Sequence, residues 1–388
     1  MKLGRSSLES RHNMSDKSKK AVLFLKDGTS FIGKGFGAMG KTSGEVVFST
    51  SMVGYTESLT DPSSKGQILT LTYPMIGNYG VPKNELNFGL PLYFESDNIQ
   101  VQGLVIHELC LEPSHWASTR TLDKWLSDEG IPGIYGIDTR RLTKKLRSDG
   151  AMLGMLQVFN STEEPDLDGL LENCANIVDP NQTDLVKKVS IKQPCKYNVD
   201  GKLTVVLIDC GVKFSIIRSL LKRGINVVRV PYDTSVDKVL SYNPDGILVS
   251  NGPGDPKQNT KTILTVRELA EKLPLMGICL GAQILALAFG ADTFKLKFGH
   301  RSQNQPVLDL TSSRCYITIQ NHSYAIDKDT LSQTPLESWY INPNDKTIEG
   351  IKHKTKPVFG VQWHPEAALG PRDTEILFDK FKKTMEAK

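Results

Sequence analysis

The feature that constrains the fold of this chain most strongly is a repeated alternation of short apolar runs and amphipathic helical segments. The expected strands are residues 203–208, 225–230, 246–250 and 275–278, and the expected helices are 213–223, 236–242, 260–272 and a segment that begins at 280. This pattern predicts an α/β fold with a doubly wound, mostly parallel sheet and helices on both faces. Ligands bind such sheets at the carboxyl ends of the strands.

Cys279 lies at one of these strand ends, between the apolar run 275–278 and the helical segment that begins at Leu280. A residue at a tight strand-to-helix turn projects from the sheet edge beside the positive end of the helix. A thiol in that position ionises more readily, and the thiolate is the nucleophilic form. The same pattern also fits a small buried cysteine, so other parts of the chain must decide between the two.

Two other segments are expected at the same edge of the sheet. Residues 250–256 (SNGPGDP) form a Gly/Pro loop, whose backbone N–H groups can approach a ligand closely. His364 precedes a proline and is therefore extended, so that His364 and Glu366 project to the same side. A thiol, a histidine and an orienting carboxylate form a nucleophilic Cys-His-acid arrangement. His300 and His322 are rival bases, and His364 is preferred because a carboxylate lies two residues away.

Composition limits the class of protein. The 388 residues suffice for two domains, and 47 basic against 43 acidic residues give no field that would indicate nucleic acid binding. Six scattered cysteines without a C-x-x-C pair suggest neither a metal site nor a disulfide framework. No run approaches the ~18 apolar residues of a membrane span. Residues 1–20 lack the apolar core of a secretory signal. We therefore expect a cytoplasmic protein with a disordered tail at 1–20.

The part before residue 159 is expected to be a β-rich α+β domain. Its expected strands are 21–25, 29–32, 45–49, 68–71 and 104–107, and a helix is expected over 138–147. Asp27-Gly28 is a hairpin turn signal between the first two strands, and Asp138 or Thr139 is the expected helix cap. The predicted organisation is a tail at 1–20, a domain at 21–158, a linker with one short helix at 159–201, and a domain at 202–388.

Residues 35–42 (GFGAMGKT) match the phosphate-loop pattern G-x-x-x-x-G-K-[ST]. That motif requires a helix directly afterwards, because the helix N-terminus holds the phosphates. The following residues, with the β-branched run at 45–49, predict a strand instead. We therefore interpret 35–42 as a glycine-rich turn between strands.

Several motifs resemble known families. GICLGAQ at 277–283, SNGPGDP at 250–256 and HPE at 364–366 resemble the signatures of class I (triad) glutamine amidotransferases, which have a flavodoxin-like fold. From Ala21 onward the chain resembles the small, glutamine-hydrolysing subunit of carbamoyl phosphate synthase. That second resemblance rests on GEVVFSTSMVGYTESLTDPS at 44–63, GIDTRRLT at 136–143, LKFGHRSQNQPV at 296–307 and QNHSYAID at 320–327.

The resemblance implies a set of site residues. Cys279 would be the nucleophile, His364 the base and acid, and Glu366 its orienting partner, with no metal. The oxyanion would be held by the backbone N–H groups of Gly252 and Leu280. The remaining groups of L-glutamine would be bound by Ser63, Gly254, Gln283, Asn321, Ser323 and Tyr324. The chain departs from the family pattern at Ser323, which replaces a glycine, at Ser302-Gln303, which replaces two small residues, and within 367–373.

The implied activity is hydrolysis of L-glutamine through a cysteine thioester to glutamate and ammonia. The ammonia would pass through an internal tunnel to a large subunit that makes carbamoyl phosphate from bicarbonate and ATP with Mg, for pyrimidine and arginine biosynthesis. The chain itself would need no cofactor, nucleic acid or membrane. Three alternatives stay open: the glutaminase component of another amidotransferase, such as that of anthranilate or GMP synthesis, a non-catalytic regulatory subunit, and a free-standing cysteine hydrolase.

Overall fold

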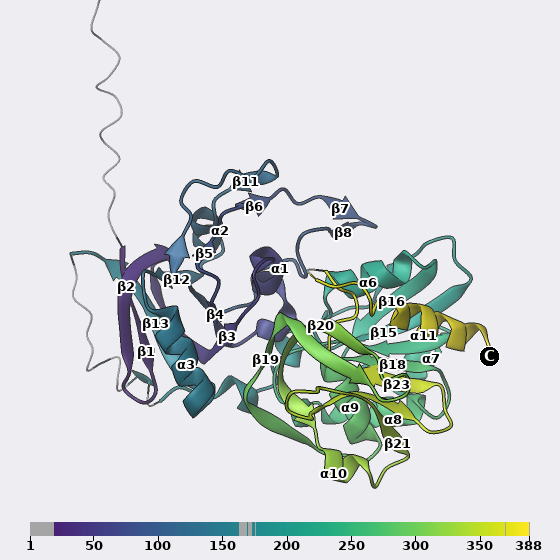
Figure 1. Ribbon diagram of the computed structural model, residues 1–388. Helices are drawn as coiled ribbons and strands as arrows, with labels where there is room; N and C mark the ends of the chain where they lie inside the picture. Colours follow the sequence, from purple (N-terminus) through teal and green to yellow (C-terminus); the bar gives the residue numbers. More distant parts are fainter. Residues whose placement is uncertain (1–18, 163–168, 170–172, 175, 369, 388) are drawn as a thin grey trace, which may run out of the picture.

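The computed structural model describes residues 19–162, 169, 173–174, 176–368 and 370–387. Figure 1 shows two units side by side, an N-terminal barrel and a C-terminal unit built on a large sheet. No helix in the described parts of the chain is long and apolar enough to cross a membrane.

Seven strands close the N-terminal barrel, in the order β1-β13-β3-β4-β9-β12-β2. They are β1 (Lys19–Leu25), β2 (Ser30–Gly37), β3 (Gly40–Ser49), β4 (Gln67–Leu71), β9 (Gly103–Val105), β12 (Pro132–Tyr135) and β13 (Met152–Asn160). Helix α3 (Thr139–Asp149) packs on this barrel through Leu142 and Leu146. Asp138 caps the helix by accepting from the N–H of Arg141, as the sequence indicates. The barrel is the predicted β-rich α+β unit.

The predicted hairpin at Asp27-Gly28 joins β1 to β2, and Gly28 adopts a positive φ of 88°. The predicted tail extends too far, because Lys19 and Lys20 belong to β1 and pair with Asn160 and Phe159 of β13. Residues 1–18 of that prediction lie outside the described residues. A barrel strand must match its neighbours in length, so β1 extends along β13 as far as Lys19. Two consecutive lysines show no apolar pattern that would predict a strand.

The phosphate-loop pattern at 35–42 lies on two antiparallel barrel strands and their connection. β2 ends at Gly37 and β3 begins at Gly40, so a strand follows the glycines. The predicted turn between strands is confirmed, and the helix N-terminus that a phosphate loop needs is missing at this point.

Smaller elements complete the N-terminal unit. These are α1 (Tyr55–Thr60), the 3-10 helix η1 (Pro62–Ser64), α2 (Leu122–Asp128), β5 (Met75–Ile76), β6 (Val81–Pro82), β7 (Leu86–Asn87), β8 (Leu90–Pro91), β10 (Glu108–Leu109) and β11 (Ser118–Arg120). Helices α1 and α2 pack on the barrel around the buried Trp125. The turn η1 places Ser63 and Ser64 at the boundary with the C-terminal unit.

The C-terminal unit is built on a ten-stranded sheet with the order β14-β16-β15-β17-β18-β23-β22-β20-β19-β21. Its strands are β14 (Cys195–Tyr197), β15 (Leu203–Asp209), β16 (Ile225–Pro231), β17 (Gly246–Val249), β18 (Leu275–Ile278), β19 (Thr293–Asp309), β20 (Cys315–Ile326), β21 (Leu336–Ile341), β22 (Ile348–His353) and β23 (Val358–Val361). The central strands β16, β15, β17, β18 and β23 are parallel, as predicted. Antiparallel strands extend the sheet at both edges.

Helices cover both faces of this sheet because its strand residues alternate in direction. Val206 and Ile208 of β15 pack with α7 (Val236–Leu240), α8 (Thr260–Leu269) and α9 (Leu280–Ala288). Val205 and Leu207 pack with α6 (Phe214–Leu221) and α11 (Ile376–Glu386) on the other face. The short helix α10 (Lys328–Leu331) follows β20. The doubly wound arrangement places the carboxyl ends of the parallel strands toward the barrel unit (Figure 1).

The segment 159–201, predicted as a linker, contains η2 (Pro180–Gln182) and α5 (Val186–Val189) in its described part. Its last element, β14, pairs with β16 and thus joins the C-terminal sheet. The exposed side chains of Cys195 and Lys196 give this three-residue strand no apolar pattern, which is why the sequence did not indicate it.

Candidate active site

The sequence around Cys279 forms a sharp turn between β18 and α9. Cys279 has φ 54° and ψ −107°, a conformation that costs a non-glycine residue about 1–3 kcal/mol. Its backbone N–H donates to the carbonyl of Val361 at 2.8 Å, which ties the turn to β23. The turn presents the thiol at the sheet edge, in front of the free N–H groups of α9.

Glycines on both sides of Cys279 make this turn possible. A Cβ on Gly281 would lie 2.1 Å from the carbonyl oxygen of Val249, and a Cβ on Gly277 would lie 2.6 Å from the carbonyl carbon of Gly281. Both distances are far below van der Waals contact. The helix therefore packs against β17 and β18 only with glycine at these positions.

Replacing Gly281 with alanine is expected to destabilise the protein by about 1–3 kcal/mol, because backbone atoms must shift to admit the methyl group. Thermal unfolding followed by circular dichroism measures this change. Gly28→Ala is the matched control: its added Cβ would meet no atom within 4 Å, so only the backbone cost of about 1–2 kcal/mol at positive φ applies. A Gly281→Ala protein as stable as wild type would contradict the close packing at the turn.

His364 and Glu366 form a buried pair beside the turn. His364 Nδ1 lies 2.7 Å from Glu366 Oε1, and Lys213 Nζ lies 2.8 Å from the same oxygen. Burial alone would lower the pKa of His364, but the charge of Glu366 raises it to about 10. Burial would raise the pKa of Glu366, but the charges of Lys213 and His364 lower it to about 2. The histidine is thus held protonated and the glutamate ionised at neutral pH.

The second ring nitrogen of His364, Nε2, is buried and has no hydrogen-bond partner among the described residues. Cys279 is one of the groups that raise the pKa of this histidine. Gln362 Nε2 donates to Cys279 Sγ at 3.6 Å, and the thiol faces the carbonyl oxygen of Asn321 at 3.8 Å. The thiol therefore lies within a fixed polar frame, with the free histidine nitrogen available for proton transfer.

Lys213 had not been predicted as a site residue, although it follows β15 at the carboxyl edge of the sheet. It is 5% exposed, and burial alone would lower its pKa, but Glu366 and other carboxylates raise it. Without this lysine, protonated His364 would be the only cation in contact with the carboxylate of Glu366 among the described residues. Lys213 thereby keeps Glu366 ionised and in position.

Lys213→Met is expected to raise the pKa of Glu366, because the buried carboxylate loses one of the two cations that stabilise its ionised form. Activity that depends on ionised Glu366 is lost as the pH falls through this pKa. For the glutamine substrate that the sequence resemblance implies, the acid limb of the kcat/KM profile should therefore move to higher pH by about 1–2 units. Lys213→Arg, which keeps the charge, is the control. An unchanged acid limb in Lys213→Met would contradict this role.

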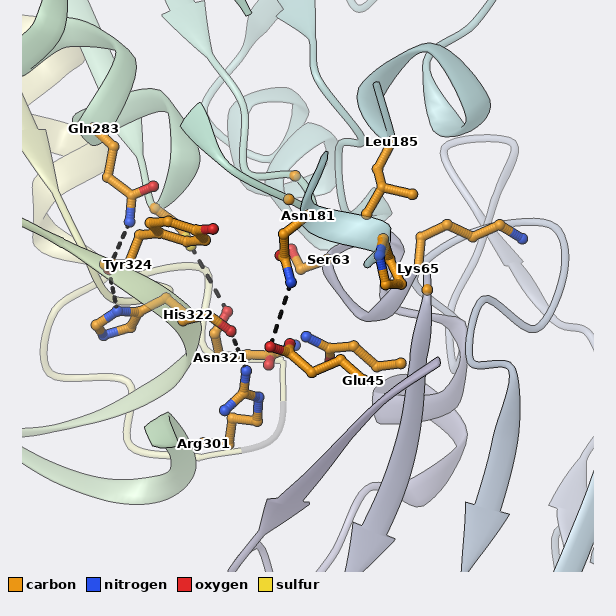
Figure 2. Close-up of a pocket in the computed structure, with 17 residues that line it drawn as sticks. Glu45, Ser63, Lys65, Asn181, Leu185, Gln283, Arg301, Asn321, His322 and Tyr324 are labelled. Atoms are coloured by element: carbon orange, nitrogen blue, oxygen red, sulfur yellow. Dashed lines mark hydrogen bonds between the residues drawn. The ribbon is translucent and has the colours of Figure 1, made fainter. Parts of the chain in front are cut away.

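A pocket between the two units (Figure 2) is lined by residues of both, and Cys279 is one of them. Eight of the predicted site residues line it: Ser63, Gly252, Gly254, Cys279, Gln283, Asn321, Ser323 and Tyr324. Leu280 is the first residue of α9, so its N–H is one that the helix leaves free beside the thiol. His364 and Glu366 do not line this pocket, and His364 instead lines a second hollow that also includes Arg301 and Asn321.

Hydrogen bonds between the units hold several of these side chains. Ser63 Oγ accepts from Asn251 Nδ2 at 2.9 Å, and Asn321 Nδ2 donates to Asp61 Oδ2 at 2.9 Å. Within the C-terminal unit, Gln283 Nε2 donates to the Tyr324 carbonyl at 2.8 Å. The pocket walls therefore depend on the docking of the barrel against the sheet.

Close packing also fixes the loop 250–256. A Cβ on Gly252 would lie 2.1 Å from the carbonyl oxygen of Cys210, so only glycine brings this backbone so near the neighbouring strand end. Ser323, which departs from the family pattern, has its hydroxyl bonded by Arg301. That hydrogen bond fixes the position of the added hydroxyl at the pocket wall.

The pocket also contains residues that the sequence did not single out, namely Glu45, Lys65, Gln67, Asn181, Leu185 and Arg301. They come from the barrel, from the connecting segment and from β19. Two of them lie in motifs that the sequence analysis quoted, Glu45 within 44–63 and Arg301 within 296–307, and these positions were the signal that could have found them.

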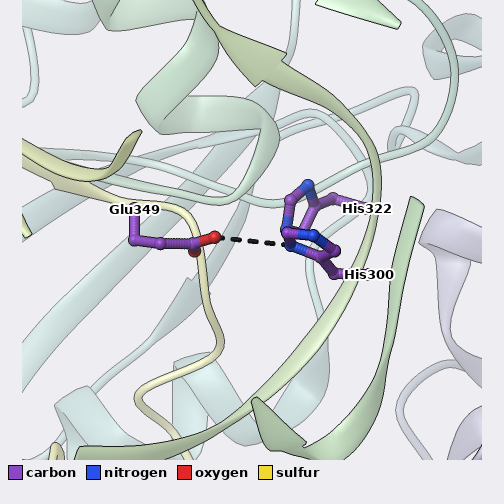
Figure 3. Close-up of side chains that lie close together, drawn as sticks. All are labelled: His300, His322 and Glu349. Carbon is purple, nitrogen blue, oxygen red and sulfur yellow. Dashed lines mark ion pairs between the residues drawn. The ribbon is translucent and has the colours of Figure 1, made fainter. Parts of the chain in front are cut away.

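The rival bases form a cluster with Glu349 (Figure 3), and one of them, His322, also lines the pocket that contains Cys279. Their ligand atoms lie within 4.8 Å of one another, which is close enough for a metal ion. However, His300 bonds Gln320 Oε1 at 3.0 Å and Asp345 Oδ2 at 2.8 Å, while His322 bonds the same Gln320 oxygen at 3.0 Å. Burial would lower the pKa of His300, but Asp345 and Glu349 raise it to about 9. These histidines are engaged in a hydrogen-bond network, and the geometry favours His364 as the base.

Comparison with known proteins agrees with this geometry. Residues 206–384 match the family model for glutamine amidotransferase class-I, which defines the class of the C-terminal unit. Residues 23–156 match the carbamoyl-phosphate synthase small chain, CPSase domain.

Three relatives extend these matches over the whole chain. The carbamoyl phosphate synthase small chain of Methanopyrus kandleri is 51% identical over 93% of this chain and 98% of its own. The small chain of Pyrococcus furiosus is 49% identical over 95% of this chain and 99% of its own. The arginine-specific small chain of Neurospora crassa is 46% identical over 95% and 80%. The chain belongs to the carbamoyl phosphate synthase small chain family. It is a glutamine-hydrolysing enzyme subunit, as the sequence resemblance implied, and the alternatives from anthranilate and GMP synthesis are set aside.

Proposed function

We propose that Cys279, His364 and Glu366 carry out the hydrolysis of L-glutamine. His364, whose raised pKa keeps it protonated, holds the proton given up by the Cys279 thiol, and the sulfur attacks the carbonyl carbon of the side-chain amide as a thiolate. The oxyanion is stabilised by the N–H groups of Gly252 and Leu280. His364 then gives its proton to the departing nitrogen, the C–N bond breaks, and ammonia and a γ-glutamyl thioester result. Water, deprotonated by His364, hydrolyses the thioester to glutamate and regenerates the thiol.

The observation that carries this proposal is the strained turn at Cys279 beside a buried histidine whose free Nε2 is the only ring nitrogen left after the Glu366 contact. Strain at a non-glycine residue persists only where the surrounding structure imposes it. A buried structural cysteine needs neither a positive φ nor a charged triad of Lys213, Glu366 and His364. The same arrangement argues against a non-catalytic regulatory subunit.

The glutamine pocket is proposed to hold the substrate through Ser63, Gly254, Gln283, Asn321, Ser323 and Tyr324. Three features support this proposal: all six line one pocket, the pocket includes the thiol, and both units contribute to it. A free-standing cysteine hydrolase is disfavoured, because in such an enzyme the whole barrel unit would serve only to form one wall of the pocket. The boundaries 21–158, 159–201 and 202–388 stay proposals for the domains of the chain.

We further propose that the ammonia passes to a large subunit, which makes carbamoyl phosphate from bicarbonate and ATP with Mg, in pyrimidine or arginine biosynthesis. The second hollow supports such a path, since Asn321 lines both it and the glutamine pocket, and His364 and four serines of the N-terminal unit line it as well. The hydroxyl groups of serine side chains can hydrogen-bond ammonia without protonating it to ammonium. In this proposal the chain is cytoplasmic, holds no cofactor of its own, and binds no nucleic acid or membrane.

The test is recovery of the partner with the tagged full chain from extracts of its own cells. The proposal predicts that a large ATP-binding protein copurifies and shows bicarbonate-dependent ATP hydrolysis. It also predicts that the pair makes carbamoyl phosphate from glutamine. Recovery of a chorismate-using or xanthosine-phosphate-using enzyme in its place would contradict the proposed partner.

A further inference from the structure

Glu45, on strand β3 of the barrel, is a buried carboxylate at the edge of the glutamine pocket (Figure 2). It is 2% exposed and is the one acidic residue among the described residues that line this pocket. None of the catalytic steps proposed above uses it. A buried carboxylate that faces a ligand site is expensive to maintain unless a cation completes its interactions.

The two oxygens of Glu45 differ in their surroundings. Oε1 accepts from Asn181 Nδ2 at 3.3 Å and pairs with Lys295 Nζ at 2.6 Å. Oε2 is buried and has no hydrogen-bond partner among the described residues. Asn181 and Lys295 thus fix the carboxylate by one oxygen and leave the other free.

The pocket is lined by side chains of both charge signs. Lys65 and Arg301 line it together with Glu45, and the Nε of Arg301 is also buried without a partner among the described residues. An α-amino acid carries an ammonium and a carboxylate on one carbon. One free carboxylate oxygen and two cations in a pocket that ends at a thiol therefore match L-glutamine in charge as well as in its side chain.

We infer that Glu45 binds the α-ammonium group of L-glutamine through its free Oε2, and that this contact selects amino acids over amides that lack the amino group. The inference rests on the proposed function. In this arrangement Glu45 acts on substrate selection rather than on bond breaking. Asn181 and Lys295 position it, which gives the segment that connects the two units a role in substrate binding.

The test compares two substrates in the complex of this chain with its large subunit. One is L-glutamine, and the other is 4-carbamoylbutanoate, which has hydrogen in place of the α-amino group. Glu45→Gln is expected to lower kcat/KM for L-glutamine about 10- to 100-fold, mainly through KM, because a charge-assisted hydrogen bond is lost. The value for 4-carbamoylbutanoate should stay within about threefold of wild type, since that substrate makes no such contact.

Lys297→Met is the matched control. Lys297 is an exposed lysine two residues beyond Lys295 along β19 and does not line the pocket, so its loss should leave the preference for L-glutamine unchanged. Unchanged carbamoyl phosphate synthesis from added ammonia verifies that each complex is intact. If Glu45→Gln does not fold, Glu45→Asp replaces it: withdrawing the charge by one methylene lowers the preference if Glu45 binds the ammonium.

Several outcomes would overturn the inference. These are an equal loss for both substrates in Glu45→Gln, an unchanged KM for L-glutamine, a wild-type preference in Glu45→Asp, or a loss in Lys297→Met as large as in Glu45→Gln. A wild-type complex that hydrolyses neither amide would instead refute the proposed function. The two failures are therefore distinguishable.

Discussion

Cys279→Ser is expected to lower glutamine-dependent carbamoyl phosphate formation at least ~10³-fold in the complex with the large subunit. The hydroxyl of serine keeps its proton far more strongly than a thiol, and the site offers a single histidine to remove it. The substitution removes no side chain from the core and keeps the backbone at the turn. The loss should therefore appear in the chemical step, with glutamine still bound.

Synthesis from added ammonia should be unaffected, because that reaction bypasses the thiol. Both activities can be measured on the same purified complex, with Cys315→Ser as the control, since Cys315 is an exposed cysteine on β20. Undiminished glutamine-dependent activity in Cys279→Ser would show that the nucleophile is wrongly assigned. Loss of both activities would point to a damaged complex instead.

His364→Asn is expected to reduce kcat for glutamine by a similar factor, about 10³ or more, because the acceptor of the thiol proton and the donor to ammonia disappear together. Glu366 would retain only Lys213 as its charged partner, so the buried carboxylate stays compensated and the fold survives. Glutamine hydrolysis and thermal unfolding, measured side by side, separate the two effects. A variant of His364 with near-normal kcat would move the role to His322 or another base.

The same histidine makes stability depend on pH. Its pKa is raised to about 10 in the folded protein. Its stabilising effect is therefore complete below its ordinary pKa of about 6.5 and is lost as the pH rises toward 10. Between pH 7 and 10 the wild type should lose more thermal stability than His364→Asn. Parallel decreases in the two proteins would contradict a raised pKa.

The local sequence contained enough to predict the core of the site. An apolar run, a cysteine between glycines and an apolar helix can fold in few ways, so the turn at Cys279 follows from short-range sterics. His364 and Glu366 lie two residues apart, and the proline between them fixes their common direction. For the same reason the alternation from residue 203 onward predicted parallel strands with helices on both faces, and the strand after Gly40 ruled out a phosphate loop at 35–42.

Tertiary structure alone decided how the two units share one pocket. Glu45, Asn181, Lys213 and Arg301 come from distant segments, and nothing in their sequence context shows that the fold brings them to one site. Their importance lies in burial and in charge pairing across the chain, such as the 2.8 Å contact of Lys213 with Glu366. The local sequence pattern predicts secondary structure through propensity and periodicity. Whether a charged side chain can be buried depends instead on which partners the complete fold places beside it. The turn at the proposed nucleophile was therefore readable from the sequence, whereas the buried charges of Glu45, Lys213 and Arg301 around it were not.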